Sequence, residues 1–153
     1  MFPFKKIMCA TDFSDSSDEA LQSAAEMAVY MNAEIFIVHM VPKMHGIPPD
    51  PLYTFEGPEQ YAQLLKADAE RQMKEIIEQR VPKDIKSQAI IRQEEAAEGI
   101  LHVAEEIDAD VIVIATHGRT GWRHLVFGSI AEKVIREAHC PVLVTRVSKT
   151  QKA

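Results

Sequence analysis

The residues best suited to chemistry in this chain lie in a glycine-rich stretch near its C-terminal end. Three of the six glycines, Gly118, Gly121 and Gly128, fall within eleven residues, and Ser129 follows directly. Glycine lets backbone N–H groups approach a ligand closely. A helix start presents unpaired N–H groups and a partial positive charge. A helix beginning at Ser129 would therefore suit phosphate, with Arg119 and Arg123 as nearby cations.

The same stretch also permits a purely structural interpretation. Ser129-Ile130-Ala131-Glu132 has the pattern of a capping box, in which serine and glutamate side chains satisfy N–H groups of the first turn. Gly128 would then only shape the turn. A cap and an anion site can also coexist, because several donors at a helix start lack partners. The local sequence leaves these interpretations open.

Familiar nucleotide and catalytic motifs are absent from the sequence. No G-x-G-x-x-G follows the first predicted strand, which argues against a nicotinamide or flavin dinucleotide site. No G-x4-G-K-[ST] occurs, so the chain is not a P-loop enzyme. We find no nucleophile with an adjacent base and an orienting acid, and nothing in the sequence demands an enzyme.

The elements that must position these residues alternate between strands and helices. Short apolar runs predict strands over 6–10, 34–41, 85–91, 110–115 and 141–147. Apolar residues at helical spacing predict helices over 16–31, 59–80, 94–109 and 129–138, with Ser14 and Ser16 competing to cap the first. This alternation predicts an α/β fold: a doubly wound, Rossmann-like, five-stranded parallel sheet with helices on both faces.

In such a sheet, ligands bind beyond the carboxyl ends of the strands, where the winding reverses. With the strand order 3-2-1-4-5, that point lies between the first and fourth strands. The first strand is followed by Ala10-Thr11-Asp12-Phe13-Ser14 and the fourth by Ala115-Thr116-His117-Gly118, so both ends become polar there. The second strand ends in Met40-Val41-Pro42, which offers an apolar wall and a backbone edge.

Composition and charge narrow the class of protein. A chain of 153 residues with 46% hydrophobic and 26% charged residues suits one domain, which we place at 1–147 with a loose tail at 148–153. A net charge of −6 argues against nucleic acid as a partner. We find no signal peptide and no apolar run near the roughly 20 residues of a membrane helix. We therefore expect a cytoplasmic protein without a membrane partner, in which Cys9 and Cys140 stay reduced.

Several stretches, taken together and in order, resemble the universal stress protein family. Ala10-Thr11-Asp12-Phe13-Ser14 and Ile37-Val38-His39-Met40 are similar to the ends of the family's first two strands. The most specific stretch is Ala115-Thr116-His117-Gly118, nine residues, then Gly128-Ser129, which resembles the signature G-x2-G-x9-G-[S/T]. The stretches 130–134 and 140–144 also fit, so the resemblance covers nearly the whole chain.

This resemblance implies a stress-response regulatory protein that binds ATP, AMP or a related adenine nucleotide, with Mg or Mn possible beside the phosphates. It implies that the adenosine side is lined by Ala10, Thr11 and Asp12 and that the backbone of Met40 contacts the adenine. It implies that the ribose and phosphates pass Ile114, Ala115, Thr116, His117, Gly118 and Arg119, and that the phosphates reach Gly128, Ser129, Ile130 and Ala131 at the helix start. It also implies a homodimer through the last strand, 141–147, where only Arg146 discourages edge pairing.

Two positions depart from the family's pattern. Ala115 stands where the signature has glycine; its methyl group crowds a ribose or phosphate, or is harmless if φ is negative. We expect the alanine at this position to affect the affinity for a triphosphate more than the binding of adenosine. Trp122 stands where an aliphatic residue is more usual, and it either caps the loop or shields the ligand by stacking.

Other tempting residues have alternative roles. The six histidines show no metal-ligand spacing, and we interpret them as structural or surface residues except His117, which either braces the loop or bonds to phosphate. Asp12 either helps hold a metal–phosphate complex or orders the turn at Ser14. Beside nucleotide-dependent regulation, two functions remain: a nucleotide-free dimeric interaction protein, favoured by Ala115, and a slow ATP hydrolase.

Overall fold

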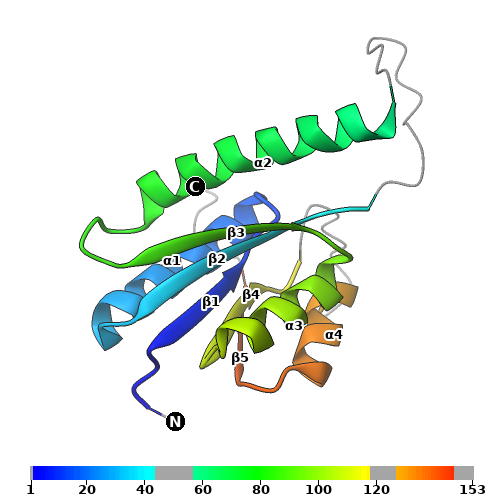
Figure 1. Cartoon of the computed structure of the whole chain (residues 1–153). Helices are drawn as coiled ribbons and strands as arrows, with labels where there is room; N and C mark the ends of the chain where they lie inside the picture. Colours follow the sequence, from blue (N-terminus) through cyan, green and yellow to red (C-terminus); the bar gives the residue numbers. More distant parts are fainter. Residues whose placement is uncertain (1, 44–56, 118–126, 147–153) are drawn as a thin grey trace, which may run out of the picture.

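Strands and helices alternate along the chain as the sequence predicts (Figure 1). The computed structural model describes residues 2–43, 57–117 and 127–146. The strands are β1 (Lys6–Ala10), β2 (Glu34–Val41), β3 (Ser87–Gln93), β4 (Val111–Ala115) and β5 (Val142–Thr145). The helices are α1 (Asp15–Met31), α2 (Pro58–Arg80), α3 (Ala96–Ile107) and α4 (Ser129–Glu137). In space the strands follow the order β3-β2-β1-β4-β5, and all four neighbouring pairs are parallel. The predicted fold class and strand order are confirmed.

The helices form two layers, one on each face of the sheet. On one face α1 and α2 cover alternate strand residues such as Ile37 and Val113. On the other face α3 and α4 cover the residues between them, such as Val38 and Ile112. Successive side chains of a strand point to opposite faces, so a sheet covered on both faces needs strands that are apolar throughout. This is why the strands read as continuous apolar runs.

Helix α1 begins directly after its N-cap residue, Ser14. Ser14 is extended, with φ −77° and ψ 161°, and its hydroxyl accepts a hydrogen bond from the N–H of Ser17 at 3.3 Å. Of the two serines that competed as caps, the structure selects Ser14, and Ser16 lies inside the first turn. The cap places the β1–α1 loop directly above the end of β1.

Several other predicted boundaries differ by one or two residues, and local turns explain two of these differences. Helix α3 ends at Ile107, earlier than expected, because Asp108 adopts a left-handed conformation with φ 53° that stops the helix. Strand β3 starts at Ser87, later than expected, because the N–H of Ile85 closes a turn on the carbonyl of Pro82 at 3.0 Å. Neither change alters the strand ends at which the site is expected.

Candidate functional site

Buried polar residues gather just beyond the carboxyl ends of β1 and β4. Among the described residues, those that are polar and buried are Thr11, Ser17 and Thr116. Thr11 follows β1 and Thr116 follows β4, and these two strands are neighbours in the sheet. Burying a polar group costs free energy unless it is hydrogen-bonded. Their position at the winding reversal marks the place where an open α/β sheet binds ligands.

The β1–α1 loop is ordered by its own side chains. The hydroxyl oxygen of Thr11 accepts a hydrogen bond from the N–H of Phe13 at 3.0 Å and lies 3.1 Å from the hydroxyl of Ser17. The carboxylate of Asp12 accepts hydrogen bonds from the N–H of Ser14, at 3.0 Å, and from its hydroxyl. The structural role predicted for Asp12, ordering the turn at Ser14, is therefore confirmed.

The end of β2 extends beyond the end of β1. Ala10, the last residue of β1, lies opposite Val38, and the carbonyl of Val38 accepts a hydrogen bond from the N–H of Thr11 at 2.9 Å. Alternate residues of a strand direct their backbone groups to the same neighbour. The N–H and C=O of Met40 therefore face the side on which β1 has already ended.

Helix α3 holds the side chain of Met40. Met40 is buried and packs beside Gly99, where an added Cβ would overlap the Met40 sulfur and lie 3.0 Å from its terminal methyl carbon. Only glycine leaves this space for the thioether. Gly99 is thus a residue of the site that the sequence analysis missed, since nothing in the helical pattern identifies its partner on β2.

The end of β4 is tied to the start of α4. The N–H of Gly128 donates a hydrogen bond to the carbonyl of Thr116 at 2.7 Å. A Cβ at Gly128 would lie only 3.1 Å from that same oxygen, so glycine allows the close approach. His117 is half-buried, and its Nδ1 lies 3.0 Å from the hydroxyl of Thr116. Its predicted role as a brace of this loop agrees with that contact.

Helix α4 starts without a side-chain cap. Gly128 is the N-cap residue and Ser129 is already helical, so the capping-box interpretation is wrong. The first hydrogen bond inside the helix runs from the N–H of Glu132 to the carbonyl of Gly128 at 2.9 Å. The N–H groups of the three residues before Glu132 therefore have no partner within the helix. Ser129 and Ile130 are exposed and Ala131 is buried.

Ala115 is compatible with the backbone of its position. It is the last residue of β4, lies opposite Thr145 of β5, and is not among the described residues with positive φ. Its methyl group packs against the apolar cluster on the α1 face of the sheet. The sequence left open whether this methyl group crowds a ribose or phosphate. The structure agrees with the interpretation that it does not.

Some predicted residues cannot be placed. Gly118, Arg119, Trp122 and Arg123 lie outside the described residues, as do 147 and the tail 148–153. The described part of the chain does bring together the other predicted residues at one end of the sheet. These are Ala10, Thr11 and Asp12 after β1, Met40 on β2, Ile114 to His117 on and after β4, and Gly128 to Ala131 at the start of α4.

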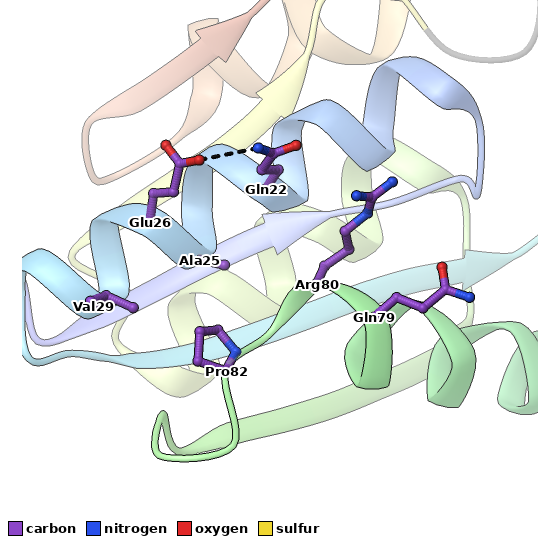
Figure 2. A pocket seen from close by; sticks show the side chains of 7 residues that line it. All are labelled: Gln22, Ala25, Glu26, Val29, Gln79, Arg80 and Pro82. Carbon is purple, nitrogen blue, oxygen red and sulfur yellow. Dashed lines mark hydrogen bonds between the residues drawn. The ribbon is translucent and has the colours of Figure 1, made fainter.

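The hollow drawn in Figure 2 lies elsewhere. It measures about 260 Å³ and is lined by residues of α1, by the end of α2 and by the turn that follows α2, namely Gln22, Ala25, Glu26, Val29, Gln79, Arg80 and Pro82. The C-terminal ends of α1 and α2 lead into the amino ends of β2 and β3. Within it Gln22 donates a hydrogen bond to Glu26 at 3.2 Å, and Arg80 is paired with Asp18. The hollow is thus separate from the strand ends described above.

Residues 2–43, 57–117 and 127–146 hold no candidate metal cluster and no candidate membrane helix. In these ranges no cluster of three or more His, Cys, Asp or Glu residues could hold a metal ion. No helix there is both long enough and apolar enough to cross a membrane. Cys9 and Cys140 are free thiols.

Comparison with known proteins decides the family. The model of the universal stress protein family matches residues 3–146. The chain belongs to the universal stress protein family. Universal stress protein MJ0531 of Methanocaldococcus jannaschii is 33% identical over 150 residues, which cover 97% of this chain and 85% of that protein.

Solved structures of the family share the fold. That of the Methanocaldococcus jannaschii protein MJ0577 has a TM-score of 0.77 and 25% identity, covering 95% of this chain and 98% of its own. A universal stress protein in complex with cAMP has a TM-score of 0.62 at 19% identity, covering 95% and 98%. One from Archaeoglobus fulgidus in complex with dAMP has a TM-score of 0.61 at 24% identity, covering 94% and 98%.

Proposed function

We propose that this universal stress protein binds an adenine nucleotide at the carboxyl ends of β1, β2 and β4 and holds the phosphates at the start of α4. The observation that carries the proposal is the uncapped start of α4, tied to the end of β4 by the Gly128–Thr116 hydrogen bond. Three backbone N–H groups, those of Ser129, Ile130 and Ala131, stand at the positive end of the helix dipole, an arrangement suited to phosphate. The exposed hydroxyl of Ser129 adds a further donor.

The adenosine would lie between the ends of β1 and β2. An adenine edge carries both an amino donor and a ring-nitrogen acceptor, which complement the backbone C=O and N–H of Met40. Ala10, Thr11 and Asp12 border the same space from β1. A carboxylate accepts hydrogen bonds from ribose hydroxyls, and Asp12 is the acidic residue of this loop before the cap of α1.

The ribose and phosphates would pass along the end of β4. Ile114, Ala115, Thr116 and His117 lead from the sheet toward the start of α4. The methyl group of Ala115 packs toward α1, which supports a ligand path unobstructed by this departure from the family signature. Roles for Gly118 and Arg119 stay predictions, because both lie outside the described residues.

The described residues do not fit a resident metal site. Asp12 is the carboxylate of the β1–α1 loop nearest β1, and it already accepts two hydrogen bonds from Ser14. Mg²⁺ is commonly bound through one or two carboxylates, substrate phosphates and water. A Mg or Mn ion would therefore arrive with the phosphates, and Asp12 would contact it through water or a single oxygen.

The family resemblance supports a regulatory role in stress response, with ATP and AMP as the candidate nucleotides. The proteins in the cAMP and dAMP complexes are only 19% and 24% identical to this chain, so these complexes support the fold alone. The proposal of a nucleotide ligand therefore rests on the residues at this chain's own strand ends. A nucleotide-free dimeric interaction protein of the same fold and a slow ATP hydrolase remain the alternatives. A cytoplasmic location stays a prediction.

We also propose a homodimer through β5. This strand lies at the edge of the sheet, and its Leu143 is 40% exposed. The two neighbours of Leu143, Val142 and Val144, pack against the core on the α3–α4 face. An edge strand with an apolar residue on its exposed face can pair with another strand, and a second copy would offer an identical edge.

Two measurements on the intact protein test nucleotide binding. Purified protein is denatured, and the released small molecules are identified by chromatography and mass spectrometry. Calorimetric titration of nucleotide-free protein with ATP, AMP and cAMP, each with and without Mg²⁺, then gives the affinities. We expect an adenine nucleotide in the extract or saturable binding in solution. An empty extract together with no heat of binding for all three nucleotides would refute the proposal.

A further inference from the structure

Phe13, in the loop after β1, adopts a conformation that aromatic residues rarely take. Its φ is 63°, in the left-handed region that favours glycine, asparagine and aspartate. Bulky L residues hold this conformation only where surrounding contacts enforce it, and such positions cluster at ligand sites. The contacts around Phe13 therefore show what fixes the loop.

The ring of Phe13 packs against the apolar cluster on the α1 face, and the hydrogen bonds of the turn come from the loop itself and the first turn of α1. The N–H of Phe13 bonds to the Thr11 hydroxyl, and Asp12 bonds to Ser14. These local bonds order the turn internally. They do not attach it to the rest of the sheet edge where the adenosine is proposed to lie.

Two contacts with β2 supply that attachment: the backbone bond from the N–H of Thr11 to the carbonyl of Val38, at 2.9 Å, and the side chain of His39, near the end of β2. Its Nδ1 lies 2.8 Å from the carbonyl oxygen of Thr11, and since a carbonyl only accepts, Nδ1 is the donor. The imidazole ring also stacks on Phe13, with the ring centres 4.3 Å apart and the planes tilted by 35°. One side chain thus holds both the backbone before Asp12 and the ring after it.

His39 and Met40 are consecutive residues with opposite orientations. The side chain of His39 reaches the β1–α1 loop, whereas that of Met40 enters the apolar cluster on the α3 face. The end of β2 is therefore fixed from both faces of the sheet. Any shift of the loop relative to Met40 must break the contact between His39 and Thr11.

We propose that His39 is a positioning residue: its hydrogen bond to the Thr11 carbonyl sets the loop of Thr11, Asp12 and Phe13 at the spacing from Met40 that adenosine binding requires. The inference rests on the proposed nucleotide site. The hydrogen bond is the essential part, because it restrains the carbonyl of Thr11, on the side that adjoins Asp12, whereas Val38 restrains only the N–H of Thr11. The stacking of His39 on Phe13 supports the same geometry.

Two substitutions separate the hydrogen bond from the ring. In His39→Asn the side-chain amide nitrogen is attached to Cγ, as Nδ1 is in histidine, so the donor is kept while the ring is lost. In His39→Phe the ring is kept and the donor is lost. A positioning role through the hydrogen bond predicts that His39→Asn binds AMP better than His39→Phe, whereas a simple packing role predicts the reverse order.

The test measures AMP affinity by calorimetry and stability by urea unfolding for the wild type and both variants. We expect AMP affinity to fall at least about tenfold in His39→Phe and less than about threefold in His39→Asn, since tenfold corresponds to about 1.4 kcal/mol. Amide hydrogen exchange supplies a readout without ligand: the N–H of Phe13 should exchange faster in His39→Phe than in His39→Asn.

A compensating change checks the mechanism in the weaker variant. Adding Phe13→Asn to His39→Phe places a residue that tolerates left-handed φ at the constrained position. We expect this to recover part of the lost affinity, at least about threefold. Wild-type affinity in His39→Phe, or stronger AMP binding by His39→Phe than by His39→Asn, would overturn the positioning role. Failure of the wild type to bind any adenine nucleotide would instead refute the proposed function, a separate outcome.

Discussion

The thioether of Met40 occupies the space beside Gly99 that a side chain at position 99 would need. This contact joins α3 to the end of β2, next to the point where β1 has stopped. Glycine inside a helix costs about 1 kcal/mol relative to alanine. Helix α3 therefore contains a destabilising glycine at the position where its contact with Met40 holds the end of β2.

We expect Gly99→Ala to lower the free energy of unfolding by about 1 kcal/mol, although alanine is the better helix former. The gain in helix propensity, about 1 kcal/mol, is opposed by overpacking against the buried Met40, typically about 1–3 kcal/mol. Urea unfolding measures the difference. Adding Met40→Val should remove the clash and reveal a favourable coupling in a double-mutant cycle. A stabilised Gly99→Ala protein would contradict this packing.

The cap of α1 gives a paired prediction on stability. Ser14→Ala removes the oxygen that accepts from the N–H of Ser17 and should cost about 1 kcal/mol. Ser16→Ala, two residues away inside the first turn, should change stability by less than about 0.5 kcal/mol. Equal losses from both substitutions in urea unfolding would mean that Ser14 does not act as the cap in solution.

Cys9 makes stability depend on pH in alkaline solution. Burial raises the pKa of its thiol from an ordinary value of 9.0 to about 12. The unfolded chain therefore ionises first, so this contribution to stability is complete below pH 9 and is lost as pH rises from 9 toward 12. We expect the stability of Cys9→Ala, although lower at pH 7, to fall less steeply between pH 8.5 and 10.5. Parallel curves from urea unfolding of the two proteins would disprove this effect.

The proposed dimer depends on the exposed edge of β5. We expect light scattering to report a dimer for the wild type and a monomer for Leu143→Lys, because a lysine on an edge strand opposes pairing. Leu64→Lys is a matched control, since Leu64 is 48% exposed but lies on α2, which packs on β2 and β3 at the other side of the sheet. A wild-type monomer at about 50 μM, or a dimer that survives Leu143→Lys, would exclude pairing through β5.

Much of the fold could be predicted because parallel strands are buried on both faces and read as apolar runs. Those runs, with helical segments between them, predicted a doubly wound sheet with the observed strand order. That order places the winding reversal near Thr11 and Thr116. The candidate site residues followed from that position and from the family resemblance.

The contacts inside the site could not be predicted in the same way, since each depends on which partner the folded chain supplies. His39 was assigned a structural or surface role because its type and spacing gave no sign of the Thr11 carbonyl beside it. Ser129 fitted the capping pattern, yet the close approach of Gly128 to Thr116 moved the cap one residue earlier. The left-handed conformation of Phe13 is likewise contrary to the preference of its residue type.

The start of α4 permits the most direct test of nucleotide binding. Ile130→Glu adds a carboxylate at an exposed position of the first turn, where 43% of the residue's surface is accessible, and negative charge there stabilises the helix. The variant should therefore fold, while its carboxylate repels a bound phosphate. Ile135→Glu adds the same charge at a residue that is 41% exposed on the same helix, five positions further along.

The decisive measurement is calorimetric titration of these two variants and the wild type with ATP, AMP and adenosine. We predict that Ile130→Glu weakens ATP and AMP binding at least about tenfold, or about 1.4 kcal/mol, with ATP affected more. Adenosine binding should remain nearly unchanged, and Ile135→Glu should behave as the wild type. Unaltered ATP and AMP affinities in a folded Ile130→Glu protein would contradict phosphate binding at the start of α4.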